Sequence, residues 1–424
     1  MDIFDMFPCF TLSADTVDCN CGDGTFMRIF RNCSENTFYE YEKLLENSGF
    51  VVLDRYDIAG NVHFTMKKDG ITVQYYFNPC SGDVRVIADP YTAPVQTQYI
   101  PVKNVYNTEL YQFETDHSLI DCGMCYIIRC ADNSFFVIDS AHFYSINDND
   151  RIHAFLRSMT PEGEKIRIAG WFITHGHDDH VCKAKDYLKY NMADTVVDCF
   201  YMNIIPTDHR DNGFWGEANK AFSDSFCETV KELGIPVVKL HTGQHFFVRN
   251  LEFEVLCTHE DVYPQVFSDY NNSSTVLMMK TMGQKILFPG DASDKSSVVL
   301  EQRYAHYLKC DIIQLAHHGH HGTSARFYEY AAAPVVLCPN TEIKINEEKH
   351  IPANQVAKAI AKEFYISANG TVKLTLPYKM GTAEVFPDET TEDFDGIKQL
   401  WNYEYTEEFK KRHNEEFAAR GGKL

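Results

Sequence analysis

The sequence predicts an α+β fold in which helices pack on sheets, preceded by a smaller α+β domain. Three observations support this prediction. Strand-like apolar runs such as 124–130 and 135–139 alternate with helical stretches such as 150–159 and 182–189. Hairpin signals dominate the N-terminal region instead. The segment 89–102 between the two contains prolines and no helical period, which is typical of a linker.

Residues 1–104 are expected to form the smaller domain. A helix is predicted over 36–47, and strand-like runs follow it. Two of these runs are joined through Asp69-Gly70, which is a strong hairpin signal. No catalytic constellation is evident in this region. A dimerisation surface, a substrate lid and a scaffold remain alternative roles, and a homodimer is expected to form through this domain if it forms at all.

The densest set of metal-binding side chains lies in the segment 174–180 (THGHDDH), directly after a strand-like apolar run. Neutral imidazoles and carboxylates are the ligands of zinc and similar divalent ions. In an extended chain, the alternating His175 and His177 point the same way and can hold one metal. Asp179 and His180 follow where the chain turns, so they can reach a second metal.

Further motifs follow in order along the chain, most of them close to a strand-like run. They are Asn272-Ser273-Ser274-Thr275, Pro289-Gly290-Asp291, His317-His318-Gly319 and His350-Ile351-Pro352. Together with the His-x-His-x-Asp-His motif, they resemble the metallo-β-lactamase superfamily, nearest to its ComEC-like (His-His-Gly) branch. The resemblance covers roughly residues 115 to 380. Phe135 to Asp139 is similar to the strand whose last residue supports the metal loop in that superfamily.

The resemblance implies a four-layer αββα sandwich over residues 105–385, with two metals where strands end. It also implies a ligand set for each metal. These ligands are His175 and His177 for the first metal, Asp179, His180 and one histidine of the 317–318 pair for the second, and Asp291 between the two.

Two assignments within this ligand set remain open. The third ligand of the first metal is expected to be His259, which follows a strand-like run, with His241 and His245 as weaker candidates. Within the histidine pair, His317 is expected to bind metal because it follows its strand directly. His318 is then expected to be catalytic, as a contact to substrate or as a proton donor.

The implied chemistry is hydrolysis with a metal-bound hydroxide, which Asp179 would orient as well as binding metal. Two divalent ions are expected, zinc first and manganese or iron as alternatives. A small phosphoester or phosphodiester is the expected substrate class, because the His-His-Gly branch resembles nucleases and phosphodiesterases. A lactam or thioester hydrolase, a non-catalytic ligand-binding protein and a nucleic-acid-processing enzyme with a basic partner are the alternatives.

Composition limits the partners. With 39 basic and 60 acidic residues, the chain has a net charge of −21 and repels phosphate backbones, which favours a small-molecule substrate over nucleic acid. No apolar run approaches the roughly 18 residues of a membrane span. The first residues lack the basic and apolar regions of a signal peptide, so a cytoplasmic location is expected. Residues 386–424 are predicted to form an acidic linker and an amphipathic helix over 406–420.

Overall fold

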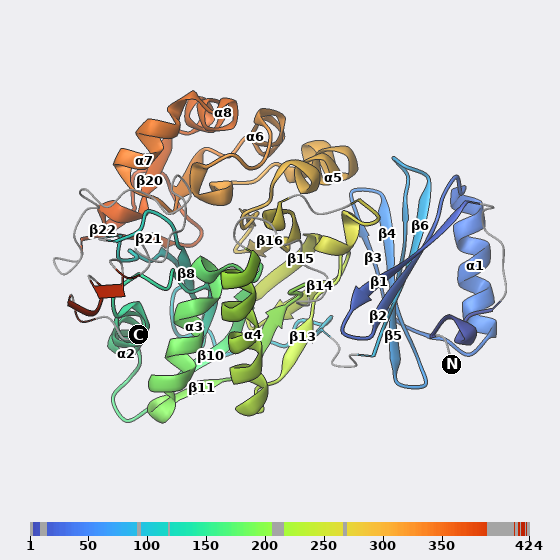
Figure 1. Ribbon diagram of the computed structural model, residues 1–424, viewed down its shortest axis with the longest axis horizontal. Coiled ribbons are helices and arrows are strands. Elements are labelled where there is room, and N and C mark those ends of the chain that lie inside the picture. Colours follow the sequence, from blue (N-terminus) through green and yellow to red (C-terminus); the bar gives the residue numbers. More distant parts are fainter. Residues whose placement is uncertain are drawn as a thin grey trace.

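The computed structural model describes residues 3–8, 15–90, 95–117, 119–205, 216–265, 269–387, 411, 414, 415, 417–419 and 421. Within these residues the chain forms three β-sheets with helices packed against them (Figure 1). The predicted α+β class is confirmed. The predicted acidic linker and most of the predicted C-terminal helix lie outside the described residues. No described helix is both long enough and apolar enough to cross a bilayer.

The N-terminal sheet is antiparallel and follows the order β1-β2-β6-β5-β4-β3. Its strands are β1 (Thr16–Gly22), β2 (Thr25–Phe30), β3 (Val51–Ile58), β4 (Asn61–Lys68), β5 (Ile71–Asn78) and β6 (Asp83–Asp89). Asp69 and Gly70 join β4 to β5 and both have positive φ (47° and 83°), as the tight hairpin turn predicted there requires. Helix α1 (Glu35–Asn47) covers one face, and its N-terminus is capped by the Ser34 side chain.

The second sheet follows the order β13-β12-β10-β9-β8-β7-β21-β22, with β11 beside β10. Its strands are β7 (Glu109–Gln112), β8 (Cys125–Arg129), β9 (Phe135–Asp139), β10 (Ile166–Ile173), β11 (Thr195–Val197), β12 (Phe200–Met202), β13 (Val237–Lys239), β21 (Thr371–Thr375) and β22 (Glu384–Phe386). The apolar outer face of this sheet packs against helices α2 (Asp148–Met159), α3 (Asp178–Tyr190) and α4 (Gly216–Glu232).

The third sheet follows the order β14-β15-β16-β17-β18-β19-β20. Its strands are β14 (His245–Val248), β15 (Leu251–Cys257), β16 (Val276–Thr281), β17 (Gln284–Phe288), β18 (Ile312–Gln314), β19 (Val335–Cys338) and β20 (Glu363–Ile366). Its outer face is covered by α5 (Asp294–Tyr304), α6 (Ala325–Ala331), α7 (Glu342–Glu347) and α8 (Pro352–Ile360).

The second and third sheets pack face to face around one apolar core. Aromatic pairs join them, with Phe136 and Phe253 at 4.6 Å and Tyr201 and Phe246 at 5.1 Å between ring centroids. The result is helix, sheet, sheet and helix in four layers. Strands β9 and β10 are parallel neighbours, as are β17 and β18, so the loops that follow them leave at the carboxyl ends of their sheets.

The N-terminal sheet is attached to this four-layer body through buried contacts, at the blue end of Figure 1. The Tyr76 hydroxyl donates to Asp261 over 2.7 Å. The ring of His63 lies directly on the backbone of Gly243, where an added Cβ would come within 1.9 Å of the imidazole Nδ1. This close fit fixes the N-terminal sheet against the turn before β14.

Candidate metal centre

The loop after β10 changes from extended chain to helix within the motif itself. His177 has extended backbone angles and precedes α3, whose first turn carries Asp178 and Asp179. Carboxylates are favoured in the first turn of a helix because the free backbone N–H groups there bear partial positive charge. The motif therefore separates into an extended part with His175 and His177 and a helical part with Asp179 and His180.

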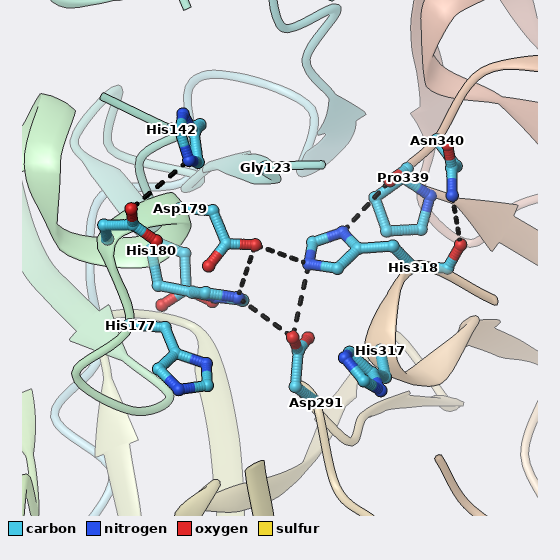
Figure 2. A network of polar contacts seen from close by, with 12 residues as sticks. Gly123, His142, His177, Asp179, His180, Asp291, His317, His318, Pro339 and Asn340 are labelled. Carbon is cyan, nitrogen blue, oxygen red and sulfur yellow. Dashed lines mark hydrogen bonds and ion pairs between the residues drawn. The ribbon is translucent and has the colours of Figure 1, made fainter. Parts of the chain in front are cut away.

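Asp179, His180, Asp291 and His318 form a buried cluster, called here the carboxylate–imidazole cluster. Each offers one ligand atom, and these atoms lie within 4.8 Å of one another. His318 Nε2 is 2.9 Å from Asp179 Oδ2 and 3.3 Å from Asp291 Oδ2 (Figure 2). His180 Nε2 lies 3.4 Å and 3.3 Å from the same two oxygens. Two imidazoles and two carboxylates thus converge on one small volume.

The second ring nitrogen of each imidazole in the cluster is held by the fold. His318 Nδ1 donates to the carbonyl oxygen of Pro339 over 3.1 Å. His180 Nδ1 lies 2.8 Å from Asp139 Oδ2, and Asp139 also accepts from the backbone N–H and hydroxyl of Thr174. Partners of this kind fix the tautomer and orientation of a metal-binding histidine. Both Nε2 atoms are therefore directed at the carboxylates. The predicted supporting role of Asp139 fits this geometry.

The electrostatics of the cluster are dominated by its two carboxylates. Burial opposes charge on His318, but Asp291 and Asp179 outweigh it and raise the pKa of His318 to about 10. The same balance raises the pKa of His180 well above its usual range. Burial also opposes charge on Asp179 and Asp291, yet the facing imidazoles hold the pKa of both carboxyl groups well below the usual range. Both carboxylates are consequently negative at neutral pH.

Several buried polar atoms of the cluster make no well-formed hydrogen bond, although ion pairs join the two imidazoles to the carboxylates. They are Nε2 of His180, Nε2 of His318 and Oδ1 of Asp291. Buried polar atoms are almost always hydrogen-bonded in proteins, so such a set needs an explanation. Imidazole nitrogens and carboxylate oxygens are also the donor set of zinc, iron and manganese. The residues present therefore fit a bound divalent cation.

A second group of donors, called here the histidine–amide group, lies beside this cluster. His175 Nε2 is 3.0 Å from His177 Nδ1 and 3.1 Å from Asn271 Oδ1. The rings of His175 and His180 are 4.2 Å apart, so the two groups are neighbours. Burial lowers the pKa of His175 and of His177, which keeps both imidazoles neutral and their lone pairs available. Tyr270 packs on His177 at 4.8 Å between ring centroids.

The structure places His318, and not His317, in the carboxylate–imidazole cluster. Both residues have left-handed backbone angles, with φ of 49° and 52°, so the chain reverses direction between β18 and the following loop. His317 is half-buried and lies outside the dashed network of Figure 2. Its Nδ1 donates to the carbonyl of His321 over 2.6 Å, and its Nε2 lies 3.1 Å from Asn271 Nδ2. His317 thus contacts the histidine–amide group instead.

His259 is not part of the carboxylate–imidazole cluster. It is buried at the start of η4 (His259–Asp261) and faces Tyr263 at 5.9 Å between ring centroids. Among the described residues it belongs to no group of three candidate ligands within 4.8 Å of one another. The weaker candidates have other partners: His241 Nε2 lies 2.9 Å from Asp89, and His245 stacks on Tyr56 at 4.0 Å.

Sequence reasoning missed Asn271, because only histidines were considered for the open position. The neighbouring Asn-Ser-Ser motif was its available signal, since the structure places this motif at the centre. Asn272 Oδ1 accepts from the backbone N–H groups of Lys295 and Ser296 at the start of α5. Ser274 Oγ accepts from the backbone N–H of Asp291 over 3.1 Å. The segment that carries Asn271 therefore also holds Asp291 in place.

A cavity of about 510 Å³ lies beside the centre. Its lining includes Asp269, two residues before Asn271, and Ser293, two residues after Asp291. Four further polar residues line it: Asp294, His321, Thr323 and Ser324. A volume of this size accommodates a small organic molecule.

No protein-family model and no curated protein sequence matches the chain. Solved structures with which it shares similarity include the metallo-beta-lactamase fold protein YhfI from Bacillus subtilis, at 11% identity over 61% of this chain and 96% of that one, with a TM-score of 0.37. Unliganded yeast PDE1 is 11% identical over 62% of this chain and 98% of that one, with a TM-score of 0.37. The short form of human tRNase Z is 12% identical over 54% of this chain and 90% of that one, with a TM-score of 0.32. Likeness at this level says nothing about a substrate.

Proposed function

We propose that this protein is a dinuclear metal-dependent hydrolase of the metallo-β-lactamase superfamily, nearest to its ComEC-like branch. The observation that carries the proposal is the carboxylate–imidazole cluster, in which Nε2 of His180, Nε2 of His318 and Oδ1 of Asp291 are buried without a well-formed hydrogen bond. The neighbouring histidine–amide group supplies the donors for a second cation. Motif order along the sequence supports the superfamily assignment.

The first metal is proposed to be held by His175 Nε2, His177 Nδ1 and Asn271 Oδ1, and the second by Asp179, His180 and His318, with Asp291 between the two. His318 takes the place expected of His317 because its Nε2 faces both carboxylates. Asn271 takes the place expected of His259. Zinc is the first choice of metal, and manganese or iron fits the same ligands.

His317 is proposed to position Asn271. Because His317 Nδ1 donates to the His321 carbonyl, its Nε2 can only accept a hydrogen bond, here from Asn271 Nδ2 over 3.1 Å. The amide is thereby oriented with its oxygen towards His175. Bound divalent ions would lower the pKa of a water molecule and stabilise negative charge on a substrate oxygen. Asp139 and Pro339 keep His180 and His318 in the orientation that this chemistry requires.

The proposed substrate is a small phosphodiester. The net charge of −21 repels long nucleic acids, and the cavity beside the centre has the size of a small molecule. Ser293, Thr323 and Ser324 line this cavity, and so do the acidic residues Asp269 and Asp294. The carboxylates favour the single negative charge of a diester over the double charge of a monoester.

Metal content and a substrate panel test the proposal. The protein, purified without chelator or affinity metal, is expected to carry about two divalent ions per chain, fewer in Asp179→Asn. Chromogenic phosphodiesters, lactams and thioesters are then compared at equal metal concentration. Turnover of phosphodiesters that is lost in Asp179→Asn is the expected result. A chain that takes up no metal on reconstitution, or one that cleaves only lactams or thioesters, contradicts it.

A further inference from the structure

Another group of candidate ligands lies outside the metal centre. His321, Glu348 and His350 each offer one ligand atom, and these atoms lie within 4.8 Å of one another. His321 follows η7 (Ala316–Gly319), whereas Glu348 and His350 are the ends of η8 (Glu348–His350). Both histidines are exposed and Glu348 is half-buried, so a cation can reach them from solvent.

The two segments that carry this trio are fastened to each other. The buried side chain of Asn354 donates from Nδ2 to the carbonyl oxygen of Gly319 over 2.6 Å. The same nitrogen donates to the carbonyl oxygen of Glu348 over 3.1 Å. The backbone that bears His321 is therefore held at a fixed separation from the backbone that bears Glu348. A site arranged in this way binds a cation without first ordering a loop.

The side chains of the trio also leave ligand atoms available. His350 Nδ1 donates to the carbonyl of Glu347 over 3.1 Å, so its Nε2 keeps a lone pair. Lys344 Nζ lies 3.0 Å and His320 Nδ1 3.5 Å from the Oε1 atom of Glu348. Both of these contacts are made to the same oxygen of Glu348.

We infer that His321, Glu348 and His350 form a separate binding site for a divalent transition metal such as zinc. Two imidazoles and a carboxylate are a donor set that zinc, cobalt and iron accept, and three protein ligands leave positions open for water or another molecule. His321 also lines the 510 Å³ cavity, so this cation would lie at the rim of that cavity. The inference does not depend on the proposed function, because the trio shares no residue with the metal centre.

Zinc titration by calorimetry tests the inference on the full chain, already loaded at the metal centre. Wild type is expected to bind about one more zinc ion per chain than His350→Ala. The affinity for that ion is expected to fall at least about 10- to 100-fold in Glu348→Gln. His306→Ala is the matched control, because His306 is exposed on η6 (Ala305–Leu308) and its ring contacts Tyr330. Equal zinc uptake by all four proteins would overturn the inference.

Two further variants separate this site from the metal centre and from surface histidines. Asp179→Asn is expected to lose zinc from the centre and to keep the additional ion, so failure of one site is distinguishable from failure of the other. Lys344→Met removes the ammonium beside Glu348 that would repel a bound cation, and zinc is then expected to bind more tightly. Unchanged affinity in Lys344→Met would exclude Glu348 as a ligand.

Discussion

The molecule contains two buried carboxylates in contrasting surroundings, Asp261 in η4 and Asp291 after β17. Asp261 accepts hydrogen bonds from the Tyr76 hydroxyl at 2.7 Å, from Arg303 Nη1 at 2.9 Å and from the backbone N–H of Thr258 at 3.1 Å. Asp291 has one oxygen with no hydrogen bond at all. Its other oxygen faces two imidazole nitrogens at 3.3 Å.

This difference separates a carboxylate that holds the fold together from one that is poised to bind. The donors to Asp261 come from the N-terminal sheet, from the residue after β15 and from α5, so this charge joins three parts of the chain. A buried charge with all its partners present is stabilising only while those partners remain. A buried charge with partners missing costs stability unless an ion supplies them, and such groups cluster at functional sites.

The largest effect is expected for Asp291, because Asp291→Asn removes the negative charge of the carboxylate proposed to lie between the two metals. In Asp291→Asn we expect phosphodiester turnover to fall to background. Zinc at the metal centre, at about 100 times its dissociation constant there, should stabilise wild type by about 2.7 kcal/mol, and this part of the zinc stabilisation should disappear in the variant. Thermal unfolding with and without zinc, beside the hydrolysis assay, measures both. An equal shift of melting temperature in the two proteins would show that Asp291 holds no metal.

Asp261→Asn should give the opposite pattern. The change leaves the buried guanidinium of Arg303 without its charge partner, and removal of one partner of a buried pair costs about 3–5 kcal/mol. We expect the free energy of unfolding in urea to fall by that amount, while zinc content per folded chain stays the same. A variant that keeps its stability but loses zinc would place Asp261 in the metal centre and remove the contrast.

The buried ion pairs of His241 with Glu260 and Asp89 give a third case, in which charge should stabilise the fold in a pH-dependent way. Burial opposes charge on His241, but Glu260 and Asp89 raise the pKa of His241 to about 9. The unfolded value is about 6.5, so charge on His241 contributes up to about 3 kcal/mol. Because the folded pKa is the higher one, this stability is complete below about pH 6.5 and is lost as pH rises through about 9.

The His241→Gln variant isolates this contribution. Wild type should lose stability in urea between about pH 6.5 and about pH 9 more steeply than the variant does. Parallel curves would mean that His241 is neutral in the folded protein.

The smallest effect is expected for Asn271, which is proposed as an uncharged metal ligand. In Asn271→Ala we expect one of the two metals to bind about 10- to 100-fold more weakly, with the other unchanged. Asn271→His offers an imidazole in the same place and should recover zinc affinity. Competition with a chromogenic chelator measures both variants. Loss of both metals together in Asn271→Ala would contradict the proposed division into two ligand groups.

Much of the scaffold was predictable because the spacing of apolar residues along the sequence follows which side chains are buried in each strand or helix. The apolar run 166–173 is β10, and Asp69-Gly70 is the predicted hairpin turn. Asp179, His180 and Asp291 come together as the motif pattern implied. These residues lie in the segments that follow β10 and β17, so the ends of these two strands set their positions.

The remaining site residues depend on backbone turns that periodicity does not encode. His317 and His318 both adopt left-handed angles, and this turn decides which of them faces the carboxylates. His259 follows β15 as expected, yet it enters η4 beside the N-terminal sheet instead of the centre. Asn271 gave no signal of its own, because an amide is a rarer metal ligand than an imidazole.

The contact between His63 and Gly243 has a consequence for the history of the chain. Any side chain at position 243 would need the space that the imidazole of His63 fills. Lineages that keep the N-terminal sheet should therefore retain glycine at position 243. Lineages that lost this sheet should be free to vary at position 243. Glycine at position 243 should therefore occur together with the N-terminal sheet across descendants of a common ancestor.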